Sequence, residues 1–172
     1  MRKSLWILIA VLVLGAGLLF RFWPHQPLPA GTRADSILVD KSARTLSLLK
    51  DGNVVASFRI ALGRHPEGHK TQRGDGRTPE GHYFISRREA HSHFYRALEV
   101  SYPNAEDKQR AAKIPADAGA DIMVHGIKNG LGWLGRLHRL VDWTDGCMAV
   151  TNEEMQDIWD ATYKGIAIEI RA

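Results

Sequence analysis

Alternation of apolar and polar positions is the dominant pattern in the chain after residue 36. Apolar residues recur at every second position in several stretches, at residues 37–39, 46–48, 54–62, 82–86 and 98–102. A period of two is typical of β-strands that bury one face. Asp51-Gly52 lies between the second and third stretches and suits a tight hairpin turn, because both residue types accept positive φ. The pattern therefore predicts that the domain opens as a meander of short strands.

Two helices and a long loop complete the predicted fold. Residues 104–113 are polar helix formers behind a suitable cap, Asn104, and residues 151–154 form a capping box ahead of apolar residues at helical spacing. Residues 64–81 are too irregular for an element and suggest a functional loop. Further strands are expected at 122–124 and 166–170. Many short strands, about two helices and no βαβ rhythm predict a β-rich α+β fold.

An uncharged apolar run from Leu5 to Phe20 follows the basic residues Arg2 and Lys3. This arrangement is typical of an export signal or a membrane anchor. We expect an uncleaved anchor at residues 5–23, because tryptophans bracket the run and a helix of that length approaches the thickness of a bilayer core. The alternative is a signal peptide. The small residues Gly15-Ala16-Gly17 could serve as its cleavage site, and cleavage would release a soluble periplasmic protein.

The positive-inside rule places the rest of the chain outside the inner membrane, in the periplasm. The predicted organisation is a signal-anchor at residues 1–23, a Pro-containing linker at 24–35 and a folded domain at 36–172. The net charge is +4, and four basic residues precede the first acidic one, Asp35. The remaining 19 basic and 19 acidic residues balance, so nucleic acid is not an expected partner.

Cys147 is the only cysteine in the chain. An exported protein usually pairs its cysteines, so a lone thiol is either a buried inert residue or a reactive group. His125, at the end of a predicted strand, is the natural proton acceptor, and lowering of the thiol pKa by such a neighbour is expected. Gly146 would let a peptide carbonyl approach, with the Gly146 and Cys147 amides as an oxyanion hole, although a simple turn explains this glycine equally well.

Taken together, these segments resemble the catalytic domain of the L,D-transpeptidase family. The matching motifs are His125-Gly126, the segment from Thr144 through Asp145 and Gly146 to Cys147, and Asn152 shortly after. Matching blocks also occur at residues 37–41, 74–81 and 101–104, so the resemblance covers roughly residues 36 to 171. It implies a β-sandwich-like fold and acyl transfer on peptidoglycan stem peptides, with no cofactor and no metal.

By this resemblance, Cys147 attacks the carbonyl of the L-centre of diaminopimelate and forms a thioester, with His125 as acid and base. A second amine then makes a cross-link or attaches a lipoprotein, for cell-wall biogenesis and cell shape, whereas water would make the protein a hydrolase that cleaves wall attachments. The resemblance also suggests residues that contact the substrate, namely Gly126, Trp143, Thr144, Asp145, Asn152 and Arg139.

Ala149 departs from the commoner family pattern, which has Arg two positions after the nucleophile. The sequence resembles a branch with a Gly-Cys-x-Ala pattern, in which cleavage of attachments is also known. The missing cation leaves transfer and hydrolysis both open. Residues that could replace it, or that could simply be solvated surface charges, are Arg77, Lys128, Arg136 and Arg139.

Two rival functions follow from other features of the sequence. One rival is a zinc-dependent peptidase. His91 and His93 alternate on a strand, as zinc ligands can, but no zinc-site spacing of carboxylates or histidines accompanies them. A non-catalytic module that tethers the membrane to the wall is the other rival. Trp143 is open to two interpretations. It forms a wall of the substrate groove, or it is an ordinary core residue.

Overall fold

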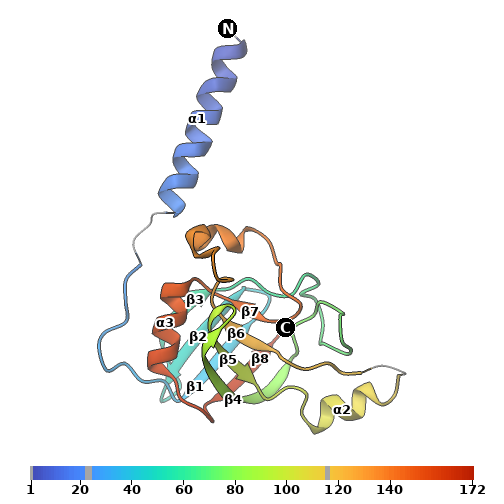
Figure 1. Cartoon of the computed structure of the whole chain (residues 1–172). Coiled ribbons are helices and arrows are strands. Elements are labelled where there is room, and N and C mark those ends of the chain that lie inside the picture. The colour runs from blue at the N-terminus through green and yellow to red at the C-terminus, as the bar shows by residue number, and fades with distance from the viewer. Residues whose placement is uncertain (1, 22–24, 115–116) are drawn as a thin grey trace.

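The alternating segments of the sequence form strands in the structure, a computed structural model that describes residues 2–21, 25–114 and 117–172. The strands are β1 (Ser36–Asp40), β2 (Thr45–Lys50), β3 (Asn53–Arg59), β4 (Gly81–Ser92), β5 (Tyr95–Val100), β6 (Met123–His125), β7 (Met148–Ala149) and β8 (Ala167–Arg171). The helices are α1 (Arg2–Arg21), α2 (Ala105–Ala111) and α3 (Asn152–Ala161), with a 3-10 segment η1 (Gly132–Leu140). The expected β-rich α+β fold is confirmed (Figure 1).

The strands form an eight-stranded mixed sheet in the order β3-β2-β1-β8-β4-β5-β6-β7. Asp51 and Gly52 join β2 to β3 with φ of 50° and 75°, which is the backbone that a tight hairpin requires. β4 is long because its first part pairs with β8 and its second part with β5. β4 therefore joins two halves of the sheet. One half contains β3, β2, β1 and β8, and the other contains β5, β6 and β7.

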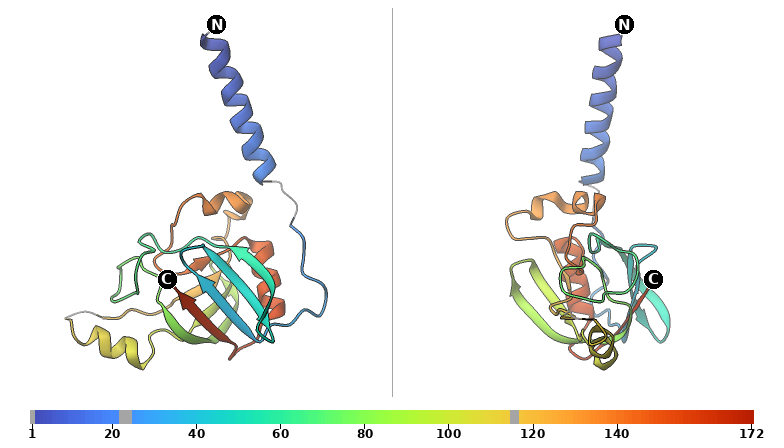
Figure 2. Two further views of the ribbon diagram at one scale, coloured as in Figure 1. Left: turned by 180° about the vertical axis from the view of Figure 1, so that it is seen from behind. Right: turned by 90° about the vertical axis from the view of Figure 1, so that its right-hand side faces the viewer.

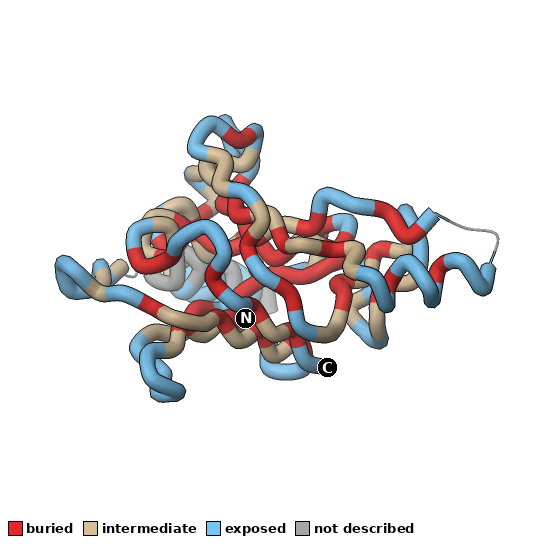
Figure 3. Tube along the Cα trace, turned by 90° about the horizontal axis from the view of Figure 1, so that it is seen from below, coloured by how far each residue is buried: buried red, intermediate tan, exposed pale blue. Residues whose placement is uncertain are grey.

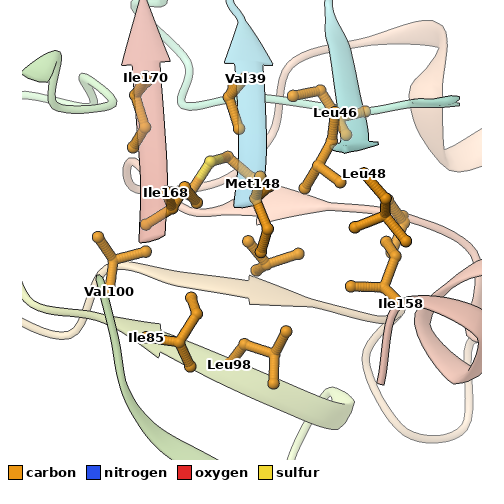
Figure 4. Close-up of a cluster of buried hydrophobic side chains, with 14 of the residues drawn as sticks. Val39, Leu46, Leu48, Ile85, Leu98, Val100, Met148, Ile158, Ile168 and Ile170 are labelled. Carbon is orange, nitrogen blue, oxygen red and sulfur yellow. The ribbon is translucent and has the colours of Figure 1, made fainter. Parts of the chain in front are cut away.

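The hydrophobic core lies between these two halves. In Figure 4, β1, β2 and β8 lie on one side of the core and β4 and β5 lie on the other. Val39, Leu46 and Ile168 face Ile85 and Leu98 across it, and all of them are at most 1% exposed. Burying each large aliphatic side chain contributes about 1.5–3 kcal/mol. The buried positions follow the strands through the middle of the molecule, and the exposed positions gather at the loops (Figure 3).

Both predicted helices begin at capping boxes. The side chain of Asn104 caps α2 together with Asp107, and Thr151 caps α3 together with Glu154. α3 begins at Asn152, and the short strand β7 separates it from Cys147. The sequence predicted that a helix begins just after Cys147, and this is wrong, because β7 comes first. Neither β7 nor η1 was predicted.

The loop at residues 64–80 is held by buried charges. The ammonium of Lys41 donates to the carbonyl of Gly68 at 2.7 Å and pairs with Glu80 at 2.7 Å. Lys70 pairs with Asp75 at 2.7 Å, and both side chains are largely buried. Although burial opposes the charged form, Lys70 and three backbone N–H groups lower the pKa of Asp75. The loop is thus a fixed wall beside the sheet.

The N-terminal helix α1 extends away from the sheet, and its C-terminal end lies beside η1 (Figures 1 and 2). Among the described residues, none of the helices combines the length and apolar character that crossing a membrane requires. The predicted boundary between anchor and linker lies at residues 22–24, outside the described residues. From His25 onwards the linker lies against α3, where His25 contacts the carboxylate of Asp157 at 2.9 Å.

Candidate active site

Cys147 follows a tight turn that Thr144 holds in place. The Thr144 hydroxyl donates to the carbonyl of Cys147 at 2.7 Å and accepts the amide N–H of Gly146 at 3.2 Å. Gly146 has φ of 122°, and a Cβ there would overlap the carbonyl oxygen of Arg77 in the long loop. The turn therefore requires glycine for both its backbone angle and its close approach to the loop.

We expect Gly146→Ala to destabilise the protein by about 3 kcal/mol or more, since positive φ and steric overlap add. Gly130→Ala is the matched control, because Gly130 also has positive φ but no atom lies within 4 Å of the position that a Cβ would take there. We expect it to cost only about 1 kcal/mol. Urea unfolding of both variants measures the difference, and equal losses would show that the contact with Arg77 has no cost.

The pairing of β6 with β7 brings His125 and Cys147 to the same face. The two strands run parallel, with Val124 opposite Met148 and His125 opposite Ala149. Cys147 lies two residues before Ala149, and residues two apart on an extended chain point the same way. Both residues accordingly line a single cavity of about 340 Å³.

The imidazole of His125 is buried and held in one tautomer. Its Nδ1 lies 2.6 Å from the carbonyl oxygen of Gly126. A carbonyl can only accept, so Nδ1 carries the proton and Nε2 keeps its lone pair. Phe94 and Trp143 pack against the ring, with centroids 4.5 Å and 5.8 Å away. Burial lowers the pKa of His125 to about 4, so the ring is neutral at pH 7.

The thiol of Cys147 is also protonated at rest. Burial raises its pKa to about 11, against the opposing effect of the Met123 backbone N–H. The carboxylate of Asp145 raises the pKa further. The thiol donates to the carbonyl of Asp121 at 3.4 Å. The expectation of a lowered thiol pKa is therefore wrong for the resting state, in which a neutral thiol and a neutral imidazole share the cavity.

Three other residues predicted for the site line the same cavity. Trp143 stacks on Phe94 at 6.1 Å, and its indole N–H donates to Nδ1 of His138 in η1 at 3.3 Å. Thr144 is buried, and Asp145 lies at the rim, where it pairs with Arg64. Trp143 thus forms a wall of the cavity beside His125. The lining residues are Glu89, Ser92, His93, Phe94, Asp121, Met123, His125, Trp143, Thr144, Asp145 and Cys147.

Gly126 and Asn152 support the segment that follows His125. The side-chain oxygen of Asn152 accepts the N–H of Ile127 at 2.9 Å. A Cβ on Gly126 would lie 2.7 Å from that oxygen. The two residues hold the segment after His125 against the start of α3, and they are not among the residues that line the cavity.

Arg139 lies away from Cys147. Its guanidinium pairs with Glu154 at 3.2 Å and donates to the carbonyl of Arg59 at 2.7 Å. It lines a different cavity together with Arg136.

Ala149 is fully buried. Among the described residues that line the cavity of Cys147, none is Arg or Lys, so Arg77 and Lys128 are not there either.

Sequence reasoning missed much of the cavity wall. The tip of the β4–β5 hairpin contributes Ser92, His93 and Phe94, and the segment before β6 contributes Asp121 and Met123. The only signal was the unusual density of histidine and aromatic residues near residue 93.

Within the described part of the chain, no three His, Cys, Asp or Glu side chains are grouped as metal ligands.

Two buried histidines make stability depend on pH. Burial lowers the pKa of His125 to about 4 and that of His138 to about 3 from an ordinary 6.5. Below pH 6.5 the unfolded chain therefore binds protons that the folded chain does not, so stability falls as pH falls. We expect His138→Gln to reduce the loss in unfolding free energy between pH 7 and 4.5 by about 2 kcal/mol.

Urea unfolding at the two pH values measures this loss. His91→Gln is the matched control, because His91 is exposed and its substitution should leave the pH dependence unchanged. The same pH dependence in His138→Gln and in the parent would contradict the burial argument.

Comparison with known proteins gives one family and several related structures. The model of the YkuD family, the L,D-transpeptidase catalytic domain, matches residues 34–170. The Escherichia coli K12 protein named "Putative L,D-transpeptidase YafK" is 28% identical over 129 residues, which are 72% of this chain and 45% of that protein.

Two solved structures share the fold. The helical cell shape determining protein Pgp2 of Campylobacter jejuni has a TM-score of 0.62 and 20% identity, over 90% of this chain and 55% of that one. Bd1075 of Bdellovibrio bacteriovorus has a TM-score of 0.56 and 24% identity, over 84% and 50%. The chain thus spans about half the length of these relatives.

Proposed function

Because the chain belongs to the L,D-transpeptidase catalytic domain family, we propose that it is a cysteine acyltransferase that acts on peptidoglycan stem peptides. Cys147 is the nucleophile and His125 is the acid and base. The observation that carries this proposal is the parallel register of β6 and β7, which directs both side chains into one cavity. A cavity of about 340 Å³ is large enough to take a peptide segment.

In the first half-reaction, Nε2 of His125 takes the thiol proton as Sγ attacks the carbonyl carbon of the L-centre of diaminopimelate. The C–N bond of that amide then breaks, and the imidazolium returns the proton to the departing amine of D-alanine. A thioester on Cys147 remains. Since both groups are neutral at rest, proton transfer accompanies attack rather than preceding it.

In the second half-reaction, an amine attacks the thioester. His125 accepts the proton of this amine and the sulfur leaves as a thiolate, which takes that proton back. The product is a new amide, either a cross-link between stems or an attachment to a lipoprotein. The aromatic wall formed by Phe94 and Trp143 limits access of water beside the ring of His125.

The developing oxyanion needs backbone donors near Cys147. Of the two amides expected from the sequence, that of Gly146 already donates to Thr144. The amide of Cys147 is therefore the donor that we assign to the oxyanion hole. Thr144 acts indirectly, because its two hydrogen bonds fix the turn.

Hydrolysis of wall attachments is the second candidate, and the lack of a cationic residue in the cavity lining favours it. Glu89, Asp121 and Asp145 are among the residues that line the cavity, and Asp145 is paired with Arg64. No Arg or Lys is among the described lining residues. Such a wall offers no cation to hold the free carboxylate of a terminal D-alanine, and it tolerates an uncharged or amine-bearing leaving group. Water in place of the acceptor amine would then complete the reaction.

Mass analysis of muropeptides separates the two candidates. The full chain is incubated in detergent with muropeptides and an isotope-labelled acceptor amine. Incorporation of label shows a transferase, and loss of cross-links or attached peptide without label shows a hydrolase. If neither occurs and Cys147→Ser still binds isolated wall, the protein is a binding module and the proposal fails.

The location in the cell is also a proposal. The basic start and the apolar run of α1 support tethering to the inner membrane by residues 5–23, with the domain in the periplasm. The partners are then the stem peptides of the wall and an attached lipoprotein. Fractionation of cells expressing the full chain tests this, since a cleaved form would be soluble and shorter.

A further inference from the structure

Exposed apolar side chains gather on the segment formed by residues 131–141, which contains η1. Leu140 is 72% exposed, Val141 65% and Trp133 64%. Among the described residues outside α1, no other large apolar side chain is as exposed as these three. We call residues 131–141 the η1 surface. Exposed large apolar side chains gathered on one segment indicate a place where a protein meets another molecule or a membrane.

A basic cavity lies beside the η1 surface. Its volume is about 550 Å³, and its walls carry the guanidinium groups of Arg59, Arg136 and Arg139 against the carboxylate of Glu154. Glu154 neutralises Arg139, with which it pairs at 3.2 Å. The walls therefore keep an excess of two positive charges. Arg side chains in a cavity bind phosphate groups well because the planar guanidinium offers several N–H donors.

The position of α1 indicates what covers this surface. In all three views of Figures 1 and 2, the C-terminal end of α1 lies beside η1, and α1 extends away from the domain on that side. Given the membrane tether proposed above for residues 5–23, a bilayer that holds this tether would face η1 and not the opposite end of the domain, where α2 lies. Apolar side chains next to basic ones are what an anionic lipid surface selects.

We propose that the η1 surface docks the domain on an anionic phospholipid bilayer, with a lipid phosphate in the arginine cavity and Leu140 and Val141 in the headgroup region. This site is separate from the cavity of Cys147 and goes beyond the proposed catalytic function. Trp143 links the two, since its indole N–H is held by His138 of η1. Docking would thus hold Trp143, and with it the wall of the Cys147 cavity, at a fixed height above the membrane.

The test measures where η1 lies relative to a bilayer. The full chain carries Cys147→Ser and a single new cysteine, at Leu140→Cys or at Lys108→Cys in α2, labelled with an environment-sensitive fluorophore. It is reconstituted in vesicles of phosphatidylcholine with or without phosphatidylglycerol, and a lipid with a nitroxide headgroup serves as quencher. Because the thiol nucleophile is absent, the result does not depend on catalysis.

We expect about half of the emission from position 140 to be quenched in vesicles with phosphatidylglycerol, because interfacial side chains lie about 5–10 Å into the headgroup boundary. Position 108 should be unaffected. Arg136→Glu should reduce quenching at position 140 by about twofold or more, whereas Lys164→Glu, an equal charge change at an exposed residue elsewhere, should not. Val141→Cys repeats the measurement if Leu140→Cys fails to fold.

Two results would overturn the proposal. Equal quenching at position 140 in vesicles with and without phosphatidylglycerol would show that the arginine cavity does not select an anionic lipid. Absence of quenching, together with loss of binding to isolated peptidoglycan in Arg136→Glu, would show that the η1 surface meets the wall instead.

Discussion

Cys147→Ser is expected to lower the turnover of muropeptides by about 10³-fold or more. A serine hydroxyl is a far weaker acid than a thiol, and the buried His125, with its pKa lowered to about 4, is a weak base. The imidazole therefore takes the proton of an alcohol during attack far less readily than that of a thiol. Muropeptide products, separated and quantified by mass, measure the rate.

The fold should be unaffected by this substitution. Serine can keep the hydrogen bond to the carbonyl of Asp121, which the thiol makes at 3.4 Å. An unchanged urea midpoint is the control, because it separates loss of the nucleophile from loss of structure. Turnover by Cys147→Ser within tenfold of the parent would place the nucleophile elsewhere.

His125→Ala is expected to lower turnover by about 10²- to 10⁴-fold, the usual contribution of a positioned acid and base. His93→Ala is the matched control, because His93 lines the same cavity but is exposed. We expect that variant to keep most of its activity. Equal losses in the two variants would mean that His125 has no special role in proton transfer.

The pH profile of the parent gives an independent test of this role. Burial lowers the pKa of His125, so its basic form prevails from about pH 4 upwards. Turnover should therefore rise as pH increases through about 4 and stay level across neutral pH, up to the pKa of the thiol near 11. A rise centred near pH 6.5 would show instead that water reaches the imidazole freely.

Local patterns in the sequence predicted both capped helices and every strand except β7, because alternation and capping depend on neighbouring residues. Ile37 and Val39 are buried in β1 as their spacing requires, and Thr151 caps α3 with Glu154. The motif around Gly146 and Cys147 indicated the candidate nucleophile for the same reason. That motif contains Thr144 and Gly146, which the turn before Cys147 requires.

Features that depend on distant contacts were not predictable in this way. The backbone of η1 is not a regular helix, because Gly135 with φ of 48° breaks it into two turns. Phe94 and Asp121 reach the cavity only because β5 pairs with β4 and β6. The neutral state of Cys147 and His125 follows from burial, which no local pattern encodes. Arg139, expected near the substrate, is drawn to Glu154 instead.

The thioester chemistry assigned to Cys147 can be tested by trapping the acyl-enzyme. The full chain is incubated with a carbapenem in detergent, and intact mass is compared for the parent and for Cys147→Ser. The account predicts one covalent adduct on the parent, mapped by peptide digestion to residue 147, and none on the variant. An unmodified parent that nonetheless converts muropeptides, or an adduct mapped to another residue, would contradict it.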